Sequence, residues 1–432
     1  MLECAKWLFS KALRVSIPVE KANQTRAIHL RVAANAGNHL IRLLRVMSKP
    51  VVASYCTTFL KPEMMHIYRQ VTGLKRVDTF VVCRERRCAE KFPFSDLHKV
   101  DRVKVNFVRR FLLKYVKKEP PVVYRGEYDA LAKILDRKQA DLLHIYFGHT
   151  GVHLLPFLRR WPRPTVCSFH GMDVQPRENQ PGYLDRMREL LEELPLVMAR
   201  SESLKERLIA LGCDPGKIRL NRTGIPMEKF SKVERTRPEN GRWHFVQACR
   251  LIEKKGLDVS LKAFADFVAK GNDARFTIAG EGPLEQEIKI LSRELGVEER
   301  IDFVGFLSEL ELADLFRRAH IFFHPSQLTP DKNQEGVPNS MLEAMATGLP
   351  VLGTVHGGIP EAVTDGSSGI LVPERDHQAL ACAVNRMVQE EGAWETMALQ
   401  AAEDVRKSFG KEEQLAKLED VYFEALEKGK DQ

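Results

Sequence analysis

Two glutamates, Glu335 and Glu343, stand eight positions apart in a segment that also contains Gly336 and Pro338. Pro338 suits the first turn of a helix, because its missing N–H would be unsatisfied there in any case. The free N–H groups of that turn favour an anion such as a diphosphate, and Gly336 lets a ligand approach the backbone closely. Glu343, about one turn inside the helix, can accept hydrogen bonds from both hydroxyls of a ribose. The pair taken alone is equally compatible with a solvated helix end.

Two cations, Arg250 and Lys255, follow a short apolar run that is typical of a strand. Arginine offers a planar fork of donors and lysine a compact charge, and both suit a diphosphate leaving group. Lys254 carries the same charge beside Lys255. The alternative is a pair of surface cations after a strand, with no ligand.

Two weaker signals follow other apolar runs. His170 comes directly after residues 165–169, where a histidine is more often structural than functional. Gly280 and Gly282 form a glycine turn after residues 275–279, as many strand-to-helix turns do. Neither signal identifies a site by itself.

The elements that must position these residues alternate between short apolar runs and helical patterns, which predicts parallel sheets in an α/β protein. Residues 231–242 are polar and without pattern, so they indicate a linker between two doubly wound domains. Ligands of such domains bind at the carboxyl ends of the strands. The expected strands are 51–55, 79–83, 142–146, 165–169 and 196–199 before the linker, and 244–248, 275–279, 301–304, 321–324 and 351–354 after it.

The bulk composition is that of a globular protein large enough for two cores, with 432 residues, 44% hydrophobic and 29% charged. No apolar run reaches the roughly 18 residues that a membrane span needs, and the start does not have the pattern of a signal peptide. The eight scattered cysteines predict reduced thiols in a cytoplasmic protein. The charge is uneven: residues 1–240 carry about +20 and residues 241–432 about −12. One domain is therefore expected to face an anionic surface, either a membrane or a nucleic acid.

The segment from Glu335 to Asp376 strongly resembles the retaining family 4 glycosyltransferases, and most of all their bacterial exopolysaccharide branch of the colanic acid type. It combines the two glutamates, a short apolar strand at 351–354, the turn 356–362 and the run 365–373. The resemblance implies the GT-B arrangement, in which two Rossmann-like domains face a cleft. It also implies a domain division into an extension at 1–46, an acceptor domain at 47–235, a donor domain at 236–395, and helices at 396–432 that return to the first domain.

The resemblance assigns a role to each matching residue. Arg250 and Lys255 would stabilise the leaving diphosphate, Glu343 would hold the ribose, and His170 would face the transferred sugar. Glu335 would bind the hydroxyls of the donor sugar. The remaining expected donor-binding residues are Gly280, Gly282, Val304, Leu307, Gly336, Val337, Pro338, Asn339 and Leu342.

The acceptor side departs from the family pattern. The first strand of the family normally ends in a glycine-rich loop, whereas residues 54–65 contain no glycine pair. Residues 57–70 instead resemble the loop and helix of the exopolysaccharide branch. Tyr146 stands where a second histidine is frequent, and Thr58 lies in the loop expected to meet the acceptor. These departures leave the acceptor open.

No Asp-x-Asp sequence occurs in the chain, so we expect no metal and no other cofactor, with cations and a helix N-terminus serving the diphosphate instead. Residues 101–118 interleave seven cations with apolar side chains, which resembles an interfacial amphipathic helix. The alternative is a helix packed on the sheet, and nucleic acid is disfavoured because no binding motif accompanies the charge. Residues 38–49 form a second, shorter candidate. The seven cations are Arg102, Lys104, Arg109, Arg110, Lys114, Lys117 and Lys118.

These inferences predict a retaining, metal-independent hexosyltransferase at the inner face of the plasma membrane. It would move a sugar from a nucleotide-diphosphate sugar to a glycan acceptor that is lipid-linked, during polysaccharide synthesis. Residues 1–46 precede the first expected strand and lie outside the resemblance, so they are expected to be dispensable or not translated, with Met47 as the start. The alternatives are another GT-B enzyme, such as an epimerase or phosphorylase, and a non-catalytic membrane-associated scaffold that kept the fold.

Overall fold

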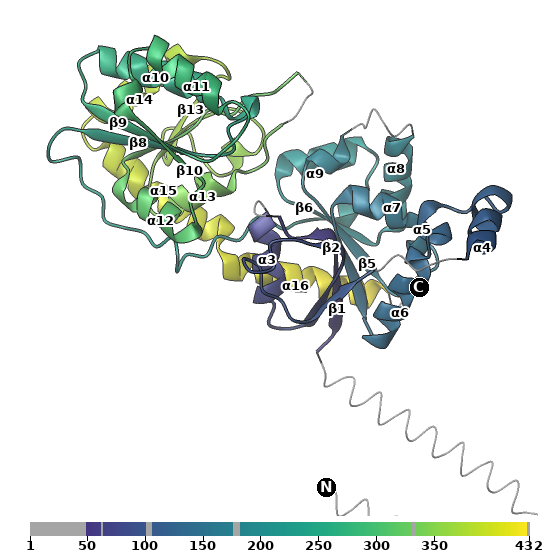
Figure 1. Ribbon diagram of the computed structural model, residues 1–432. Helices are drawn as coiled ribbons and strands as arrows, with labels where there is room; N and C mark the ends of the chain where they lie inside the picture. The colour runs from purple at the N-terminus through teal and green to yellow at the C-terminus, as the bar shows by residue number, and fades with distance from the viewer. Residues whose placement is uncertain (1–48, 62–63, 101–105, 176–181, 331–333, 430–432) are drawn as a thin grey trace, which may run out of the picture. The chain divides into compact units, whose positions relative to one another are not determined.

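The computed structural model describes residues 49–61, 64–100, 106–175, 182–330 and 334–429, and those from Val51 onward belong to one compact unit. This unit contains two parallel sheets, each with helices on both faces (Figure 1). The expected extension at 1–46, the segment 38–48 of the shorter amphipathic candidate, and Arg102 and Lys104 lie outside the described residues.

The first sheet has seven strands in the order β3-β2-β1-β4-β5-β6-β7. Every strand pair is parallel, and β4 and β5 are buried along their whole length, as expected of a sheet covered on both faces. Its strands are β1 (Val51–Phe59), β2 (Asp78–Arg86), β3 (Leu97–Lys99), β4 (Leu142–Tyr146), β5 (Thr165–Phe169), β6 (Leu196–Ala199) and β7 (Ile218–Leu220). Its helices are α3 (Met65–Gly73), α4 (Phe107–Phe111), a π-helical turn η2 (Leu112–Val116), α5 (Pro121–Tyr124), α6 (Glu127–Arg137), α7 (Gly148–Leu158), α8 (Tyr183–Glu193) and α9 (Glu202–Ala210).

The second sheet has six strands in the order β10-β9-β8-β11-β12-β13. Both sheets thus share the Rossmann strand order 3-2-1-4-5-6, in which the fourth strand returns to pair beside the first. The strand order reverses at this point, although all strands run parallel. Its strands are β8 (Trp243–Ala248), β9 (Ala274–Ala279), β10 (Ile301–Gly305), β11 (Ile321–His324), β12 (Val351–Thr354) and β13 (Gly369–Val372). Its helices are α10 (Leu257–Ala269), α11 (Glu285–Glu294), α12 (Glu309–Arg318), α13 (Asn339–Ala346), α14 (His377–Gln389) and α15 (Ala393–Phe409).

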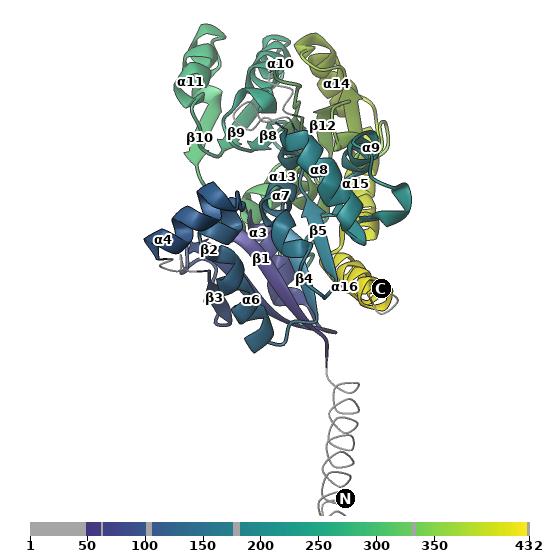
Figure 2. The same ribbon diagram turned by 90° about the vertical axis from the view of Figure 1, so that its right-hand side faces the viewer.

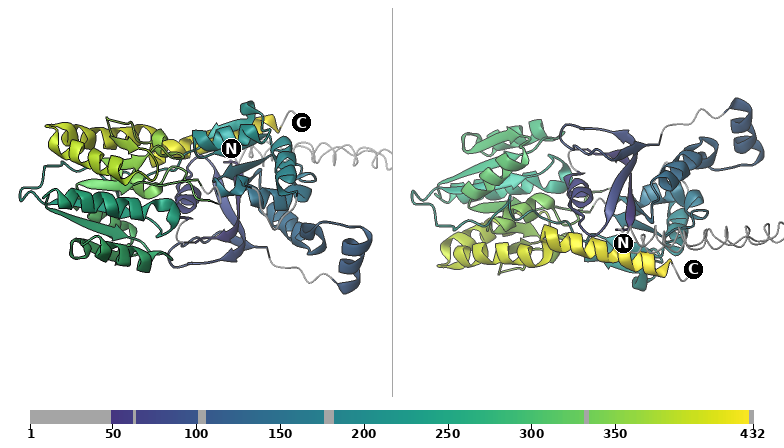
Figure 3. Two further views of the ribbon diagram at one scale, coloured as in Figure 1. Left: turned by 90° about the horizontal axis from the view of Figure 1, so that it is seen from above. Right: turned by 90° about the horizontal axis from the view of Figure 1, so that it is seen from below.

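The last helix, α16 (Lys411–Lys428), packs against β4 and β5 of the first sheet, as Figures 2 and 3 also show. Its apolar side chains share a core cluster with Val52 of β1 and Leu142 of β4. The side chain of Tyr422 hydrogen-bonds to His144 Nδ1 at 2.7 Å, inside the sheet. One face of the first sheet is therefore covered by α16, which follows the second sheet in the sequence.

The two passages of the chain between the sheets lie side by side. Ile225 and Gly410 form an isolated β-bridge, with Ile225 N donating to Phe409 O at 2.8 Å and Lys411 N donating to Ile225 O at 3.0 Å. A Cβ on Gly224 would lie 2.8 Å from the Cα of Lys411, so this close approach requires glycine. The segment around Ile225 is therefore paired with the segment that joins α15 to α16.

Candidate active site

Two buried lysines and one glutamate form an ionic cluster beyond the carboxyl end of β8. Lys254 and Lys255 lie in the 3₁₀ turn η5 (Glu253–Lys255), directly after β8. Lys255 Nζ donates a short hydrogen bond to Glu335 Oε2, and Lys254 Nζ lies 3.7 Å from Glu335 Oε1. Burial raises the pKa of the Glu335 carboxyl, but Lys255 and Lys254 outweigh this effect and lower the pKa to about 2. Glu335 is therefore a carboxylate throughout the physiological pH range.

The backbone beneath these lysines is held by buried polar groups. Gln247 donates from Nε2 to Lys255 O at 2.9 Å, and Gln327 N donates to Lys254 O at the same distance. Gly256 follows with φ +60°, and a Cβ there would lie 2.0 Å from Pro325 O, so no larger residue fits. The turn that presents both ammonium groups is consequently rigid.

The loop that carries Glu335 is fixed from behind by His356. Glu335 N donates to His356 Nε2 at 3.0 Å, which places the proton of the neutral ring on Nδ1, 2.6 Å from Glu374 Oε1. A Cβ on Gly357 would lie 2.1 Å from Glu335 O, and one on Gly358 would also clash with this loop. The glycine pair therefore allows the turn after β12 to pack directly on the backbone of the Glu335 loop.

Helix α13 begins at Asn339, one residue later than the sequence predicts, with Pro338 as its N-cap. The Oγ of Ser340 donates to Ala248 O at 2.6 Å and so fastens the helix start to the end of β8. Gly336 is exposed, and a Cβ on it would meet no atom within 4 Å. Open space therefore borders the loop at Gly336, between Glu335 of the ionic cluster and the start of the helix, where an anion is favoured. Of the other expected donor residues here, Leu342 is buried in the core and Val337 packs partly on it.

Glu343 lies inside α13, as predicted, and is buried. Its Oε1 accepts from Arg69 Nη2 at 2.9 Å, and the same Nη2 also donates to Glu309. Burial raises the pKa of the Glu343 carboxyl, although Arg69 opposes the shift. Arg69 belongs to α3, far away in the sequence, and no local pattern pointed to it.

The other expected donor residues lie on neighbouring loops. Arg250 is exposed after β8, and Val304 and Leu307 lie at the end of β10 and just beyond it. A Cβ on Gly280 would lie 1.8 Å from Cys249 O, and one on Gly282 would lie 2.4 Å from Leu251 O. The two glycines therefore have a packing reason, because their turn lies directly against the chain that leaves β8.

His170 follows β5 in the first sheet, where Asp173 fixes its loop. The buried Asp173 carboxylate accepts from Gly148 N at 2.8 Å, from His170 N at 3.0 Å and from Gly171 N at 2.9 Å, as expected of a loop anchor. Burial and then Arg200 lower the pKa of His170 well below its usual range, so the ring is neutral. Arg200 Nη1 donates to Nδ1 at 3.2 Å, which leaves the proton on Nε2, a buried atom without a hydrogen-bond partner among the described residues.

The two expected acceptor-side residues differ in their surroundings. Thr58 is half-buried near the carboxyl end of β1, where its hydroxyl donates to Glu85 at 3.5 Å. Tyr146 is fully buried at the end of β4, and its ring lies 4.0 Å from that of His144.

Within the described residues, His170 contacts rings of its own half, such as Phe147 at 4.3 Å, and none of the donor-side groups.

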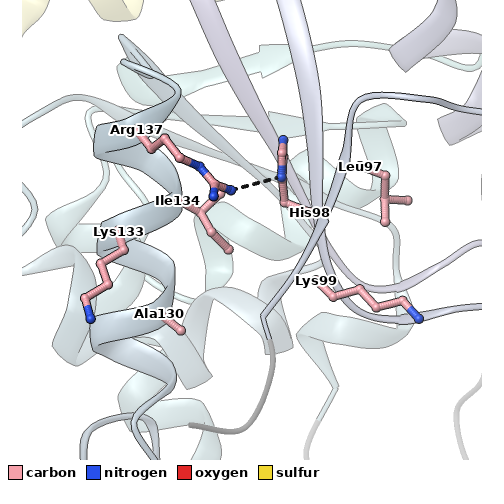
Figure 4. Close-up of a pocket in the computed structure, with 7 residues that line it drawn as sticks. All are labelled: Leu97, His98, Lys99, Ala130, Lys133, Ile134 and Arg137. Atoms are coloured by element: carbon pink, nitrogen blue, oxygen red, sulfur yellow. Dashed lines mark hydrogen bonds between the residues drawn. The ribbon is translucent and has the colours of Figure 1, made fainter.

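A surface cavity of about 400 Å³ lies away from these residues, between β3 and α6 (Figure 4). Arg137 donates to His98 Nδ1 at 3.3 Å across it, whereas Lys99 and Lys133 point away from each other. Its polar groups do not converge on one point, so this cavity is not part of the candidate site.

Two Rossmann-like sheets in one compact unit, with a cationic cluster at the strand ends of the second sheet, define the GT-B fold class. Solved structures support the fold: sucrose-phosphate synthase from Thermosynechococcus elongatus has a TM-score of 0.68 at 18% identity, covering 87% of this chain and 99% of that one. Anabaena HepE in complex with UDP has a TM-score of 0.69 at 17% identity, covering 87% and 100%.

Sequence comparisons identify the family. Residues 65–229 match the model described as Glycosyltransferase Family 4, and residues 229–407 match Glycosyl transferases group 1. The putative colanic acid biosynthesis glycosyltransferase WcaL of Salmonella typhimurium is 34% identical over 287 residues, 65% of this chain and 70% of that protein. The amylovoran biosynthesis glycosyltransferase AmsK of Erwinia amylovora is 34% identical over 272 residues, 62% and 67% of the two chains. The chain belongs to the family 4 glycosyltransferases, in their bacterial exopolysaccharide branch, which confirms the predicted family and fold.

Proposed function

We propose that this glycosyltransferase moves a hexose from a nucleotide-diphosphate sugar to a growing glycan with retention of configuration and without a metal ion. The acceptor is a glycan carried on a lipid at the inner face of the plasma membrane. The observation that carries the donor assignment is the position of Lys255 and Glu335 beside the first turn of α13. Cations and free N–H groups meet there at the carboxyl ends of strands, where α/β proteins bind phosphorylated ligands.

The proposed reaction forms a bond between an acceptor hydroxyl oxygen and the anomeric carbon of the donor. The bond from that carbon to the diphosphate oxygen breaks, and the hydroxyl proton passes to the departing phosphate. Arg250, Lys255 and the first turn of α13 stabilise the charge that grows on the diphosphate. Glu335 accepts hydrogen bonds from the sugar hydroxyls, and Glu343 accepts from the ribose. His170, neutral and with Nε2–H free, orients the sugar from the first sheet.

We expect the purified protein to be stabilised against heat by the diphosphate of one nucleoside among UDP, GDP and ADP. A ligand at 100 times its Kd adds about 2.7 kcal/mol to the free energy of unfolding, which corresponds to a shift of a few degrees. Differential scanning fluorimetry measures this shift, and it is expected to vanish in Lys255→Ala. The exposed Lys270→Ala is the matched control and is expected to keep the shift. The absence of any shift in the wild type would contradict the donor site.

Sugar transfer is tested by measuring whether an acceptor glycan becomes longer. Incubation with the selected nucleotide sugar and lipid-linked glycans from an exopolysaccharide producer is expected to lengthen one of them by one sugar, as detected by mass spectrometry. Donor binding without any lengthened glycan would favour the non-catalytic scaffold.

The helix α4 and the turn η2 support the proposed membrane contact. Phe107 is 80% exposed and Val116 64% exposed, and α4 and η2 contain no buried residue. Figure 3 shows α4 projecting beyond the sheet and the helices that cover it. Arg109, Arg110 and Lys114 lie on the same ten-residue stretch, with Lys117 and Lys118 directly after it. Exposed apolar and cationic side chains in one helix are typical of an interfacial helix. The described residues include no helix long and apolar enough to span a bilayer.

We expect the triple variant Arg109→Gln, Arg110→Gln and Lys114→Gln to bind anionic vesicles at least tenfold more weakly than the wild type. Each cation near an anionic leaflet contributes about 1 kcal/mol. Co-sedimentation with phosphatidylglycerol-containing vesicles measures the affinity, with phosphatidylcholine vesicles and 1 M salt as comparisons. Leu399→Ser, at an exposed apolar position of α15, is the control and should bind like the wild type. Equal binding of the triple variant and the wild type would overturn the assignment of this surface.

A further inference from the structure

One arginine joins the helix that carries Glu343 to a helix of the first sheet. Arg69 lies on α3, and its Nη2 contacts Glu343 of α13 at 2.9 Å and Glu309 at the start of α12. The side chains of Arg69 and Glu343 are each 10% exposed, and that of Glu309 is 18% exposed. The three charged groups are therefore largely removed from solvent, where each depends on the others for compensation.

The second glutamate has a cation of its own. Lys229 also contacts Glu309, so two cations and two carboxylates balance in this cluster. Without Arg69, the described residues would leave Glu343 as a buried carboxylate with no cation in direct contact. The Nη2 of Arg69 donates to both glutamates. The Nε of Arg69 is buried and has no hydrogen-bond partner among the described residues.

The contact with Arg69 leaves most of the accepting capacity of Glu343 unused. An ionised carboxylate offers about four lone-pair sites on two oxygens, and the Arg69 contact takes one of them on Oε1. Two ribose hydroxyls need two such sites. Arg69 and a ribose can therefore be bound by the same carboxylate at the same time, with the arginine fixing its plane.

We propose that Arg69 is a positioning residue for the nucleotide: it orients the Glu343 carboxylate so that its free lone pairs accept from the ribose hydroxyls. This role rests on the proposed function, because it takes the nucleotide as the ligand of Glu343. It makes donor recognition depend on a side chain of α3, which belongs to the first Rossmann set. The acceptor half then contributes to the selection of a ribonucleotide over a deoxyribonucleotide.

The test compares one nucleoside diphosphate, the one that stabilises the wild type, with its 2′-deoxy form by isothermal titration calorimetry. We expect the wild type to bind the 2′-deoxy form about 10-fold to 100-fold more weakly, the loss typical of a hydrogen bond to a charged group. In Arg69→Met this ratio should fall below about threefold. Arg69→Lys should restore part of it. Arg76→Met removes an exposed arginine shortly after α3 and should keep the wild-type ratio.

The outcomes distinguish the positioning role of Arg69 from the proposed donor site. An unchanged ratio in Arg69→Met, with both nucleotides bound more weakly by the same factor, would overturn the positioning role and leave the donor site standing. Equal affinity of the wild type for the two nucleotides would also overturn the positioning role and leave the donor site standing. Failure of every nucleoside diphosphate to bind the wild type would overturn the proposed function and the role of Arg69 with it. Circular dichroism and the midpoint of thermal unfolding establish that each variant is folded.

Discussion

Lys255→Ala is expected to lower kcat at least tenfold while the protein stays folded. Lys255 contributes a buried ammonium group at the carboxyl end of β8, where charge would grow on the departing diphosphate. The removal of one preorganised donor from a developing anion typically costs about 100-fold to 1,000-fold in turnover. The substitution also leaves Glu335 with Lys254 alone, at 3.7 Å, so the carboxylate loses its closest partner. Glu335→Ala should cause a loss of similar size, because it removes the group proposed to bind the donor sugar.

Initial rates over a range of donor concentrations measure the effect on kcat and on KM separately. Loss of a contact that strengthens in the transition state lowers kcat, whereas loss of ground-state binding raises KM alone. Lys270→Ala is again the matched control, since Lys270 is an exposed lysine at the end of α10. Near-normal turnover in both Lys255→Ala and Glu335→Ala would mean that the ionic cluster serves stability and not transfer.

Asp173→Ala is expected to lower the free energy of unfolding by about 3 kcal/mol or more. The carboxylate is 2% exposed and accepts from the backbone N–H groups of Gly148, His170 and Gly171. Alanine would leave one buried donor and two part-buried donors without this acceptor, at a cost of about 1 kcal/mol or more for each. Because two of these donors belong to the loop of His170, the variant should also lose activity in the fraction that remains folded.

Urea-induced unfolding followed by circular dichroism measures this change. Asp173→Asn keeps one carbonyl oxygen at the same place and should lose less stability than the alanine variant. Asp185→Ala removes a carboxylate that is 75% exposed and should stay within about 0.5 kcal/mol of the wild type. If Asp173→Ala behaved like Asp185→Ala, the loop would have another anchor.

The strands that were predicted from the sequence are mostly buried apolar runs, such as β4 and β11. A parallel strand covered on both faces consists almost wholly of apolar residues, so it stands out from its polar neighbours. Three further strands, β3, β7 and β13, were not predicted. Each lies at an edge of its sheet and has only three or four residues, and β3 and β7 contain polar side chains. Such short edge strands depend on a neighbour for their conformation, and the neighbour is not adjacent in the sequence.

The chemical types at the site could be predicted, whereas several of their partners could not. Lys255 and Glu335 were recognised from separate motifs, and the structure adds that they contact each other across 80 positions. Arg69 is 274 positions from Glu343 and lies in a helix without a distinctive pattern. The glycine pair after His356 indicated a turn at this place in the sequence. The hydrogen bond from Glu335 N to His356, however, forms only once that turn is folded. Pairings over such separations are set by the topology of the sheets.

The position of α16 has a consequence for the order in which the chain can fold during synthesis. Val52 and Leu142 of the first sheet share their core with Leu418 and Tyr422 of α16, which follows the whole second sheet in the sequence. A ribosome has therefore produced the whole donor half before the acceptor half can cover this face. Until then the apolar face of the first sheet that α16 covers stays exposed on the nascent chain, and such surfaces are prone to aggregation.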